Sequence, residues 1–223
     1  MYGIMGLIHG GCAVIMVSLA IGVYRQKPDI QRYEAFLARQ PIFVQTVIVA
    51  VLALIFAGGL DLITGKFAFP AWFFDSIGLI VHEGGHFLTS WAGRFIHFLG
   101  GTLFEIGVPA GLTLWFLSSN CKRLGAFTLA WSSIAMFSAS KYSGDANTLE
   151  LSLLGASDDI EDKMVSHDWY NILGMIGQLD AAPLVSDLFW SVAVVAGLAA
   201  IALPIWAAYL DHRSQAVFDQ KLS

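Results

Sequence analysis

Residues 71–93 read AWFFDSIGLIVHEGGHFLTSWAG, a long apolar run that carries two histidines and a glutamate near its middle. On a helix, His82 and His86 are four residues apart and lie one turn above the other on the same face, so both can reach one metal ion. Glu83 stands beside them and can face a metal-bound water. The run therefore predicts a membrane helix that carries a metal site.

The composition of the whole chain agrees with a membrane location. Of the 223 residues, 57% are hydrophobic and 13% are charged, and the mean hydropathy is +0.67. Soluble domains carry about 25% charged residues. We therefore expect one integral membrane domain covering residues 1–223, embedded in the lipid bilayer. A nucleic-acid partner is excluded, because no basic stripe with interleaved aromatic residues is present.

Apolar runs follow one another along the chain and predict an all-α, polytopic helical bundle of about six membrane segments. The first run begins without a basic leader or a small-residue cleavage site, so we expect it to remain as a membrane helix. The runs cover residues 4–23, 43–60, 71–93, 110–117, 125–139, 167–179 and 184–210.

The segment 95–109 differs from its neighbours, because it contains Gly100, Gly101, Gly107 and Pro109. Glycine and proline are the poorest helix formers, so the segment predicts irregular backbone rather than a straight helix. Irregular backbone at membrane depth is tolerated where it packs against protein. We therefore predict a re-entrant, Gly-rich segment here.

Basic residues suggest the orientation of the chain. Arg25, Lys27, Arg32 and Arg39 lie in the connection after the first run, which favours a cytoplasmic loop. If every run crossed the membrane once, Lys122 and Arg123 would lie on the opposite side of the membrane from this basic loop, against the positive-inside tendency. A re-entrant segment within 95–117 removes this conflict.

One polar, acidic segment interrupts the apolar pattern at residues 141–168. Its carboxylates fit a solvated loop, and a lid or a docking surface is the alternative. The acidic residues are Asp145, Glu150, Asp158, Asp159, Glu161, Asp162 and Asp168.

The three ionisable side chains within residues 82–86 need an explanation. Inserting one such side chain near the middle of a spanning helix costs about 2.5–3.5 kcal/mol. Zinc supplies one: two imidazoles and a third protein ligand hold the ion, and an open position holds water. Glu83 would accept the proton of that water, which then attacks a polarised carbonyl. The pattern thus favours a zinc-dependent hydrolase with Glu83 as its catalytic residue.

Two histidines do not hold a catalytic zinc ion alone, and several residues compete to be the third ligand. Asp168 is our first choice, because His167-Asp168-Trp169 opens an apolar helical pattern where the chain re-enters the membrane. His167 and Asp145 are the alternatives. Two of these three residues also have a structural interpretation: Asp168 can cap a helix, and Asp145 can be an ordinary turn residue. The remaining competitors are Glu105 and Asp180.

Other interpretations of the polar residues stay open. The cluster can hold helices together without a metal, or a histidine of the pair can ligate haem together with His9. Asp75, seven residues before His82, can orient that histidine or cap the helix. His97 and His212 fit interfacial or solvated positions better than catalytic ones.

With these residues in view, the stretch His82 to His86, followed by Gly100-Gly101-Thr102-Leu103-Phe104-Glu105, resembles the core of site-2-protease-type intramembrane zinc metalloproteases. The resemblance covers roughly residues 72–110. It implies that His82 and His86 bind zinc and that Glu83 activates water to cleave a peptide bond in a membrane-associated protein or peptide.

The chain departs from that family downstream, where the Asn-Pro and Leu-Asp-Gly pattern that supplies the third ligand is missing. It also resembles bacterial membrane proteins in which a His-Glu-x-x-His helix, a Gly-Gly-Thr-Leu segment, an Asp-Ala pair and a His-Asp-Trp group occur in this order. This resemblance implies a location in a bacterial inner (cytoplasmic) membrane. We therefore expect an intramembrane zinc metallopeptidase. The alternative is a non-catalytic structural or accessory subunit of a larger membrane complex.

Overall fold

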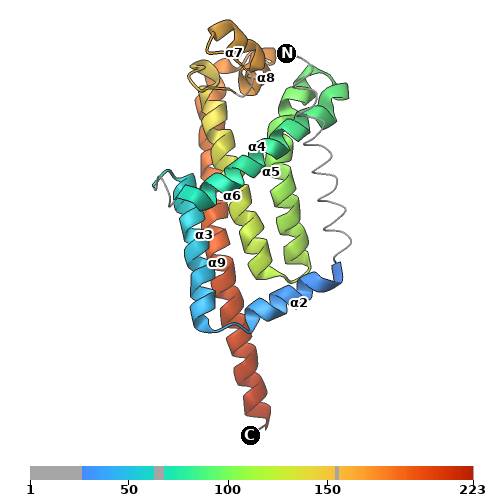
Figure 1. Cartoon of the computed structure of the whole chain (residues 1–223), viewed down its shortest axis with the longest axis vertical. Helices are drawn as coiled ribbons and strands as arrows, with labels where there is room; N and C mark the ends of the chain where they lie inside the picture. Colours follow the sequence, from blue (N-terminus) through green and yellow to red (C-terminus); the bar gives the residue numbers. More distant parts are fainter. Residues whose placement is uncertain (1–26, 63–67, 154–155, 223) are drawn as a thin grey trace.

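The computed structural model describes residues 27–62, 68–153 and 156–222, and within them it is all-α. This confirms the all-α part of the predicted fold class (Figure 1). The first apolar run, residues 4–23, and His9 lie outside the described residues. The helices are α2 (Lys27–Ala38), α3 (Ile42–Gly59), α4 (Phe69–Thr89), α5 (Arg94–Ser118), α6 (Lys122–Gly144), α7 (Ile160–Ser166), α8 (Asp168–Met175) and α9 (Ala182–Leu222). Short 3-10 turns lie at η2 (Ser90–Ala92), η3 (Asp145–Asn147) and η4 (Leu179–Ala181).

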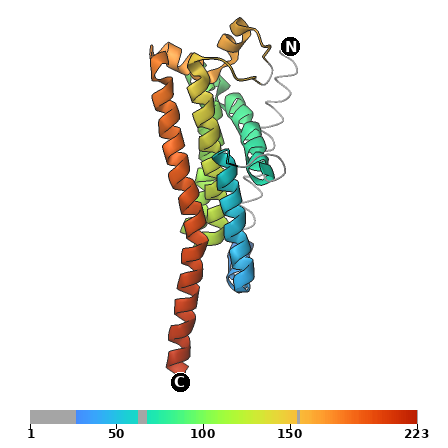
Figure 2. The ribbon, with the colours of Figure 1, turned by 90° about the vertical axis from the view of Figure 1, so that its left-hand side faces the viewer.

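Four helices, α3, α5, α6 and α9, run roughly along the long axis of the molecule, as Figures 1 and 2 show. Helix α4 crosses them obliquely, α2 lies across one end, and α7 and α8 lie at the other end. Helix α9 is the longest, with 41 residues, and its last turns extend beyond the other helices. The chain therefore has two distinct ends, one marked by α2 and one by α8.

Three helices in the described part of the chain are long and apolar enough to cross a membrane. They are Ile42–Gly59, Arg94–Ser118 and Leu179–Ser214, and they agree with a membrane location. The predicted runs 43–60 and 184–210 coincide with α3 and α9. The run 71–93 is indeed helical, as α4, but neither α4 nor α6 is among the three candidate spans. The run 167–179 contains only the short helix α8.

The prediction of irregular backbone at 95–109 was wrong, because α5 is a continuous helix of 25 residues with Pro109 inside it. The glycines serve packing instead. A Cβ built on Gly85 of α4 would lie 2.3 Å from the carbonyl oxygen of Gly100 on α5. Small residues let two helix backbones approach this closely. The contact between α4 and α5 therefore outweighs the low helix propensity of glycine.

Two apolar clusters hold the elements together. The larger one joins α3, α4, α6 and α9 and includes Leu52, Ile55 and Ala130. The smaller one lies under α8, where Trp169 and Ile172 pack with residues of η3 and α9. This second cluster attaches α8 to the bundle and so positions the first residue of that helix, Asp168.

The predicted acidic loop at 141–168 is only partly a loop. It begins with the last turn of α6, and it contains η3 and the whole of α7. Asp159 caps α7, because its side chain accepts a hydrogen bond from the backbone N–H of Glu161. The carboxylates of Asp158, Asp159 and Glu161 are exposed, which agrees with a solvated segment.

Candidate metal centre

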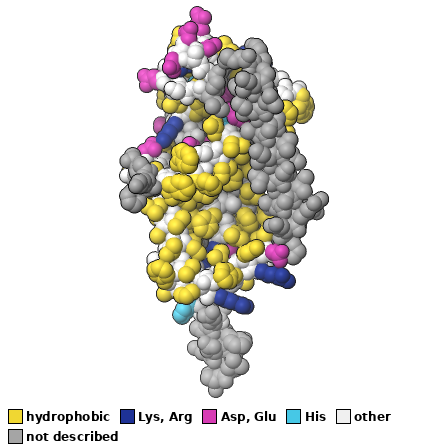
Figure 3. Space-filling model, in the orientation of Figure 1, with side chains coloured by type: hydrophobic (Ala, Val, Ile, Leu, Met, Phe, Trp, Pro, Cys, Tyr) yellow, Lys and Arg dark blue, Asp and Glu magenta, His cyan; other side chains and the backbone are white. Residues whose placement is uncertain are grey.

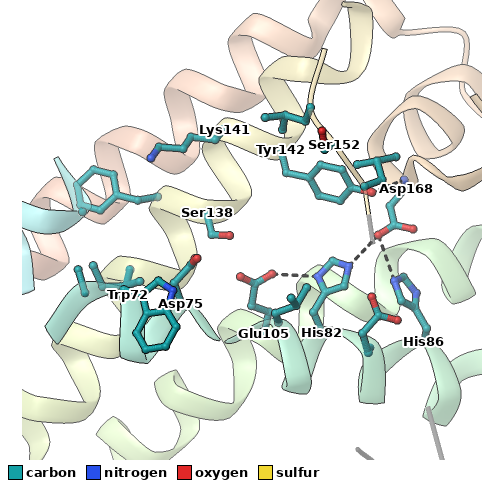
Figure 4. A pocket seen from close by; sticks show the side chains of 18 of the residues that line it. Trp72, Asp75, His82, His86, Glu105, Ser138, Lys141, Tyr142, Ser152 and Asp168 are labelled. Carbon is teal, nitrogen blue, oxygen red and sulfur yellow. Dashed lines mark hydrogen bonds and ion pairs between the residues drawn. The ribbon is translucent and has the colours of Figure 1, made fainter. Parts of the chain in front are cut away.

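The centre is built from three buried side chains on two helices. His82 and His86 lie on one face of α4, with ring centroids 4.7 Å apart. Asp168 is the first residue of α8, and its Oδ2 atom lies 2.9 Å from Nε2 of His82 and 3.1 Å from Nε2 of His86 (Figure 4). The fold thus brings together a His-His-Asp group that could hold a metal ion.

Several contacts fix the start of α8. The backbone N–H of Asp168 donates to the Tyr142 hydroxyl at 2.9 Å, and the Trp169 indole N–H donates to Thr102 on α5 at 3.2 Å. The His167 ring caps the helix, because its Nδ1 accepts from the backbone N–H of Tyr170. Three residues in a row are therefore anchored, and Asp168 is held in place between its neighbours.

The outer nitrogen of each histidine is also engaged. Nδ1 of His82 lies 3.0 Å from the Glu105 carboxylate, and Nδ1 of His86 donates to the backbone carbonyl of His97 at 2.7 Å. Such partners orient an imidazole and keep a proton on Nδ1, so the lone pair of Nε2 can face a metal. Both Nε2 atoms point toward Asp168 (Figure 4).

Gly101 on α5 gives the two rings their space. A Cβ built there would lie 2.5 Å from Nε2 of His82 and 2.6 Å from Nε2 of His86. No real side chain tolerates such contacts, so glycine is required where the three ligand atoms converge. This is a second, independent reason for the pair of glycines in α5.

A cavity of about 910 Å³ opens beside the centre. His82, His86 and Asp168 form part of its wall, together with Glu83, which is half-buried. Glu83, the predicted catalytic residue, therefore faces the same space as the candidate ligands. The cavity extends along α4 to Asp75 and, on α6, to Lys141.

The two alternative ligands lie elsewhere. His167 packs its ring on Tyr142, with centroids 4.3 Å apart, and its Nε2 is 3.4 Å from Oδ2 of Asp145. Burial lowers the pKa of His167, and the Asp145 carboxylate opposes this without outweighing it. Asp145 itself accepts hydrogen bonds from Thr148 and from the backbone N–H groups of residues 150 and 151, as a turn aspartate does.

The remaining candidates also have definite places. Glu105, weighed as a ligand, contacts His82 from the outer side. Asp75 lines the cavity and does not cap α4, because the residue before the first turn is Ala68. Asp180 is exposed in η4. His97 was expected at an interface, yet its Nδ1 and its carbonyl both bond to His86. In a helix over 95–109, the four-residue spacing of Gly101 and Glu105 places both on one face, although the spacing does not show that this face meets the histidines.

The donor set fits zinc. Two neutral imidazoles and one carboxylate are a common protein ligand set for catalytic zinc. Burial raises the pKa of Asp168, but hydrogen bonds from His82 and His86 outweigh it, so that pKa lies below its usual value and the group is a carboxylate. Ligand atoms about 2.0–2.2 Å from a tetrahedral ion lie about 3.4 Å from one another. The observed 2.9 and 3.1 Å would need to lengthen by only a few tenths of an ångström.

The chain matches no protein-family model, no curated protein and no solved structure. Over its described residues, the protein is helical, with three candidate membrane spans and a buried His-His-Asp group. Any function must be argued from that group.

Proposed function

We propose that the protein is a zinc-dependent metallopeptidase that hydrolyses peptide bonds in a membrane-associated protein or peptide. In this proposal His82, His86 and Asp168 hold the ion and Glu83 is the catalytic residue. The observation that carries the proposal is the single oxygen of Asp168 within 3.1 Å of both Nε2 atoms, in the wall of a cavity that Glu83 also lines. The two ligand elements are 82 residues apart in the chain, so neighbourhood in sequence does not account for their meeting.

Zinc, when bound, polarises a carbonyl and lowers the pKa of water to about 7. Glu83 accepts a proton from the attacking water, whose oxygen bonds to the carbonyl carbon. The C–N bond then breaks, and Glu83 delivers the proton to the leaving amine nitrogen. Glu105 and the carbonyl of His97 keep the two imidazoles oriented, through contacts of 3.0 and 2.7 Å.

The rival is a structural or accessory subunit of a membrane complex, and one observation favours it. The contacts of Asp168 with the two histidines already have hydrogen-bond lengths. They join α4 to α8 and would hold these helices without an ion. Metal content separates the two proposals directly.

The first experiment is elemental analysis of the purified full-length chain. We expect about one zinc ion per chain, lost in His82→Ala, His86→Ala and Asp168→Ala, because each change removes one of three ligands. His212→Ala and Asp180→Ala are matched controls at exposed positions and should keep the metal. A well-folded wild-type protein that takes up no added zinc would contradict the proposal and favour the structural rival.

The second experiment separates metal binding from catalysis. Glu83→Gln should retain zinc and lose cleavage of a quenched fluorescent casein by at least about a hundredfold, because the amide cannot accept the proton. The same casein assay on Asp168→Ala should also show loss of cleavage. Unchanged cleavage in Glu83→Gln would refute the assigned role of Glu83.

A further inference from the structure

The end of the molecule that carries α2 is tied together by one buried cation. Arg123, in the first turn of α6, bonds to Glu34 of α2, to Gln45 of α3 and to Asp211 of α9. Only 2% of its side chain is exposed. Helix α2, the start of α3, the turn between α5 and α6, and the polar part of α9 therefore share one end, which we name the basic end.

Basic residues gather at that end. The turn between α5 and α6 lies beside α2, since Gln31 donates to the carbonyl of Ser119. Membrane proteins place their excess of Lys and Arg on the cytoplasmic side. The described cations there are Arg32, Arg39, Lys122, Arg123 and Arg213. Arg123 is buried against Glu34 and Asp211, and Arg32 pairs with Asp29, so Arg39, Lys122 and Arg213 stand outside these ion pairs. Three described cations lie toward the opposite end. Lys163 is buried, Lys141 is paired with Asp61, and the third is Arg94.

Acidic residues dominate the opposite end, around α7 and α8. On the face in Figure 3, apolar side chains cover the middle of the molecule, acidic ones gather at one end, and Lys and Arg side chains stand toward the other. Exposed Tyr33, Trp206 and Tyr209 lie at the basic end, and exposed Trp72 on α4 and Trp91 in η2 lie away from it. Two groups of Trp and Tyr are typical of the two membrane–water boundaries.

The lengths of two helices give the distance between the two boundaries. Helix α3 has 18 residues, and Lys141 follows Arg123 by the same number on α6, so each spans about 27 Å. A bilayer has a hydrocarbon core of about 30 Å. Both helices lead to the same point, because Lys141 pairs with Asp61 just after α3, with 56% and 66% of the side chains exposed. A charged pair this exposed marks water, not lipid.

The candidate centre lies at this second boundary. Tyr142 follows Lys141 directly, and its hydroxyl accepts from the backbone of Asp168. The cavity beside the centre reaches both Asp61 and Lys141. We propose that the basic end rests on the anionic headgroups of the cytoplasmic leaflet and that the His82–His86–Asp168 centre opens to water at the opposite, outer face of the membrane.

The position of the centre at the outer boundary limits which substrates can reach it. This part of the inference rests on the proposed function. A centre at the outer boundary takes peptide segments that lie at or just outside the outer leaflet. Transmembrane helices at mid-bilayer depth would not reach it. The oblique course of α4 explains the depth, since α3 alone makes the crossing, α4 follows the end of α3 that leads to Asp61, and the histidines lie in the second half of α4.

The test uses single cysteines in the full-length chain, with Cys12 and Cys121 replaced by serine, and a membrane-impermeant maleimide. Asp158→Cys should react in right-side-out vesicles and not in inside-out vesicles, and Ser214→Cys should do the reverse. Leu62→Cys, just after α3, should react from the outside. Leu54→Cys, within α3 and also exposed to the surroundings of the protein, should react only after detergent is added.

Opposite labelling of Asp158→Cys and Ser214→Cys would overturn the orientation. Labelling of Asp158→Cys from outside, together with protection of Leu62→Cys from both sides, would overturn the depth. Each variant must first keep the zinc content of its cysteine-free parent, or its monodispersity if the parent holds none, so that misfolding is recognised. Because labelling needs neither metal nor cleavage, its failure is distinct from a failure of the proposed function.

Discussion

Gly101 shows how a single residue controls the chemistry available to its neighbours. The two Nε2 atoms converge where a side chain at position 101 would stand, within 2.6 Å of both. Glu105 lies one helical turn later and contacts the outer nitrogen of His82. One face of α5 therefore provides both the space for the imidazoles and the carboxylate that orients one of them.

Gly101→Ala should abolish zinc binding, because the new methyl group displaces both imidazoles from their common point. Gly107→Ala is the matched control on the same helix, since a Cβ there meets no atom of the described residues within 4 Å. Zinc content and thermal unfolding in detergent check both variants. Full zinc occupancy in Gly101→Ala would show that the zinc ion is not held between the two Nε2 atoms.

At the scale of elements, the crossing of α4 and α5 decides where the histidines meet α8. Gly85 and Gly100 bring the two backbones together, and Thr89 packs against Gly100 while its hydroxyl donates to the Gly85 carbonyl. Helix α8, with only eight residues, is too short to be stable alone. It depends on Trp169, Tyr142 and the apolar cluster beneath it.

Gly85→Ala should destabilise the protein, because its Cβ would lie 2.3 Å from a backbone oxygen that no side-chain rotation can remove. Overpacking of this kind costs about 1–3 kcal/mol. Gly111→Ala, where a Cβ meets no atom of the described residues within 4 Å, should instead be neutral or stabilise by up to about 1 kcal/mol. Unfolding curves in one detergent compare the two variants. Equal stability of both would mean that the close crossing is not needed.

At the scale of the whole molecule, the candidate centre and the Arg123 cluster are separate. About 27 Å of α6 lies between Arg123 and Lys141. The first site joins α4, α5 and α8, and the second joins α2, α3, α6 and α9. Damage to one end should therefore leave the other intact.

Arg123→Ala should lower the free energy of unfolding by about 3–5 kcal/mol, because it leaves the largely buried Glu34 carboxylate without its cation. The amount of zinc per folded chain should not change. Arg32→Ala removes an exposed pair with Asp29 and should cost at most about 1 kcal/mol. Chemical unfolding and elemental analysis of both variants check the result, and zinc loss in Arg123→Ala would contradict the independence of the two ends.

Much of the molecule could be predicted from its sequence. Hydropathy over 43–60 and 184–210 predicted α3 and α9, because an apolar run of that length buries its backbone polar groups only as a helix. The four-residue spacing of His82 and His86 placed both on one face of α4. Asp168 was preferred as the third member of the group because it begins an apolar pattern, and it does contact both histidines. Whether the group binds zinc stays a prediction.

The sequence misled where packing outweighed local propensity. Gly100, Gly101 and Pro109 argued against a helix at 95–109, yet α5 is continuous there, because close contact with α4 and the imidazoles needs residues without side chains. The conflict over Lys122 and Arg123 also disappears without a re-entrant segment. Helix α3 leads away from the end that holds Glu34, α4 lies obliquely beyond it, and α5 leads back, so Arg123 lies on the side of Glu34.

By itself, then, the sequence determined the helical class, the long apolar helices that favour a membrane location and the pair of histidines, because periodicity and hydropathy are properties of adjacent residues. Only the tertiary structure decided that Asp168 rather than His167 or Asp145 reaches that pair, and that Glu105 and His97 orient it. These contacts join residues 11 to 86 positions apart. Their lengths depend on how closely helices cross, which spacing along one helix cannot reveal.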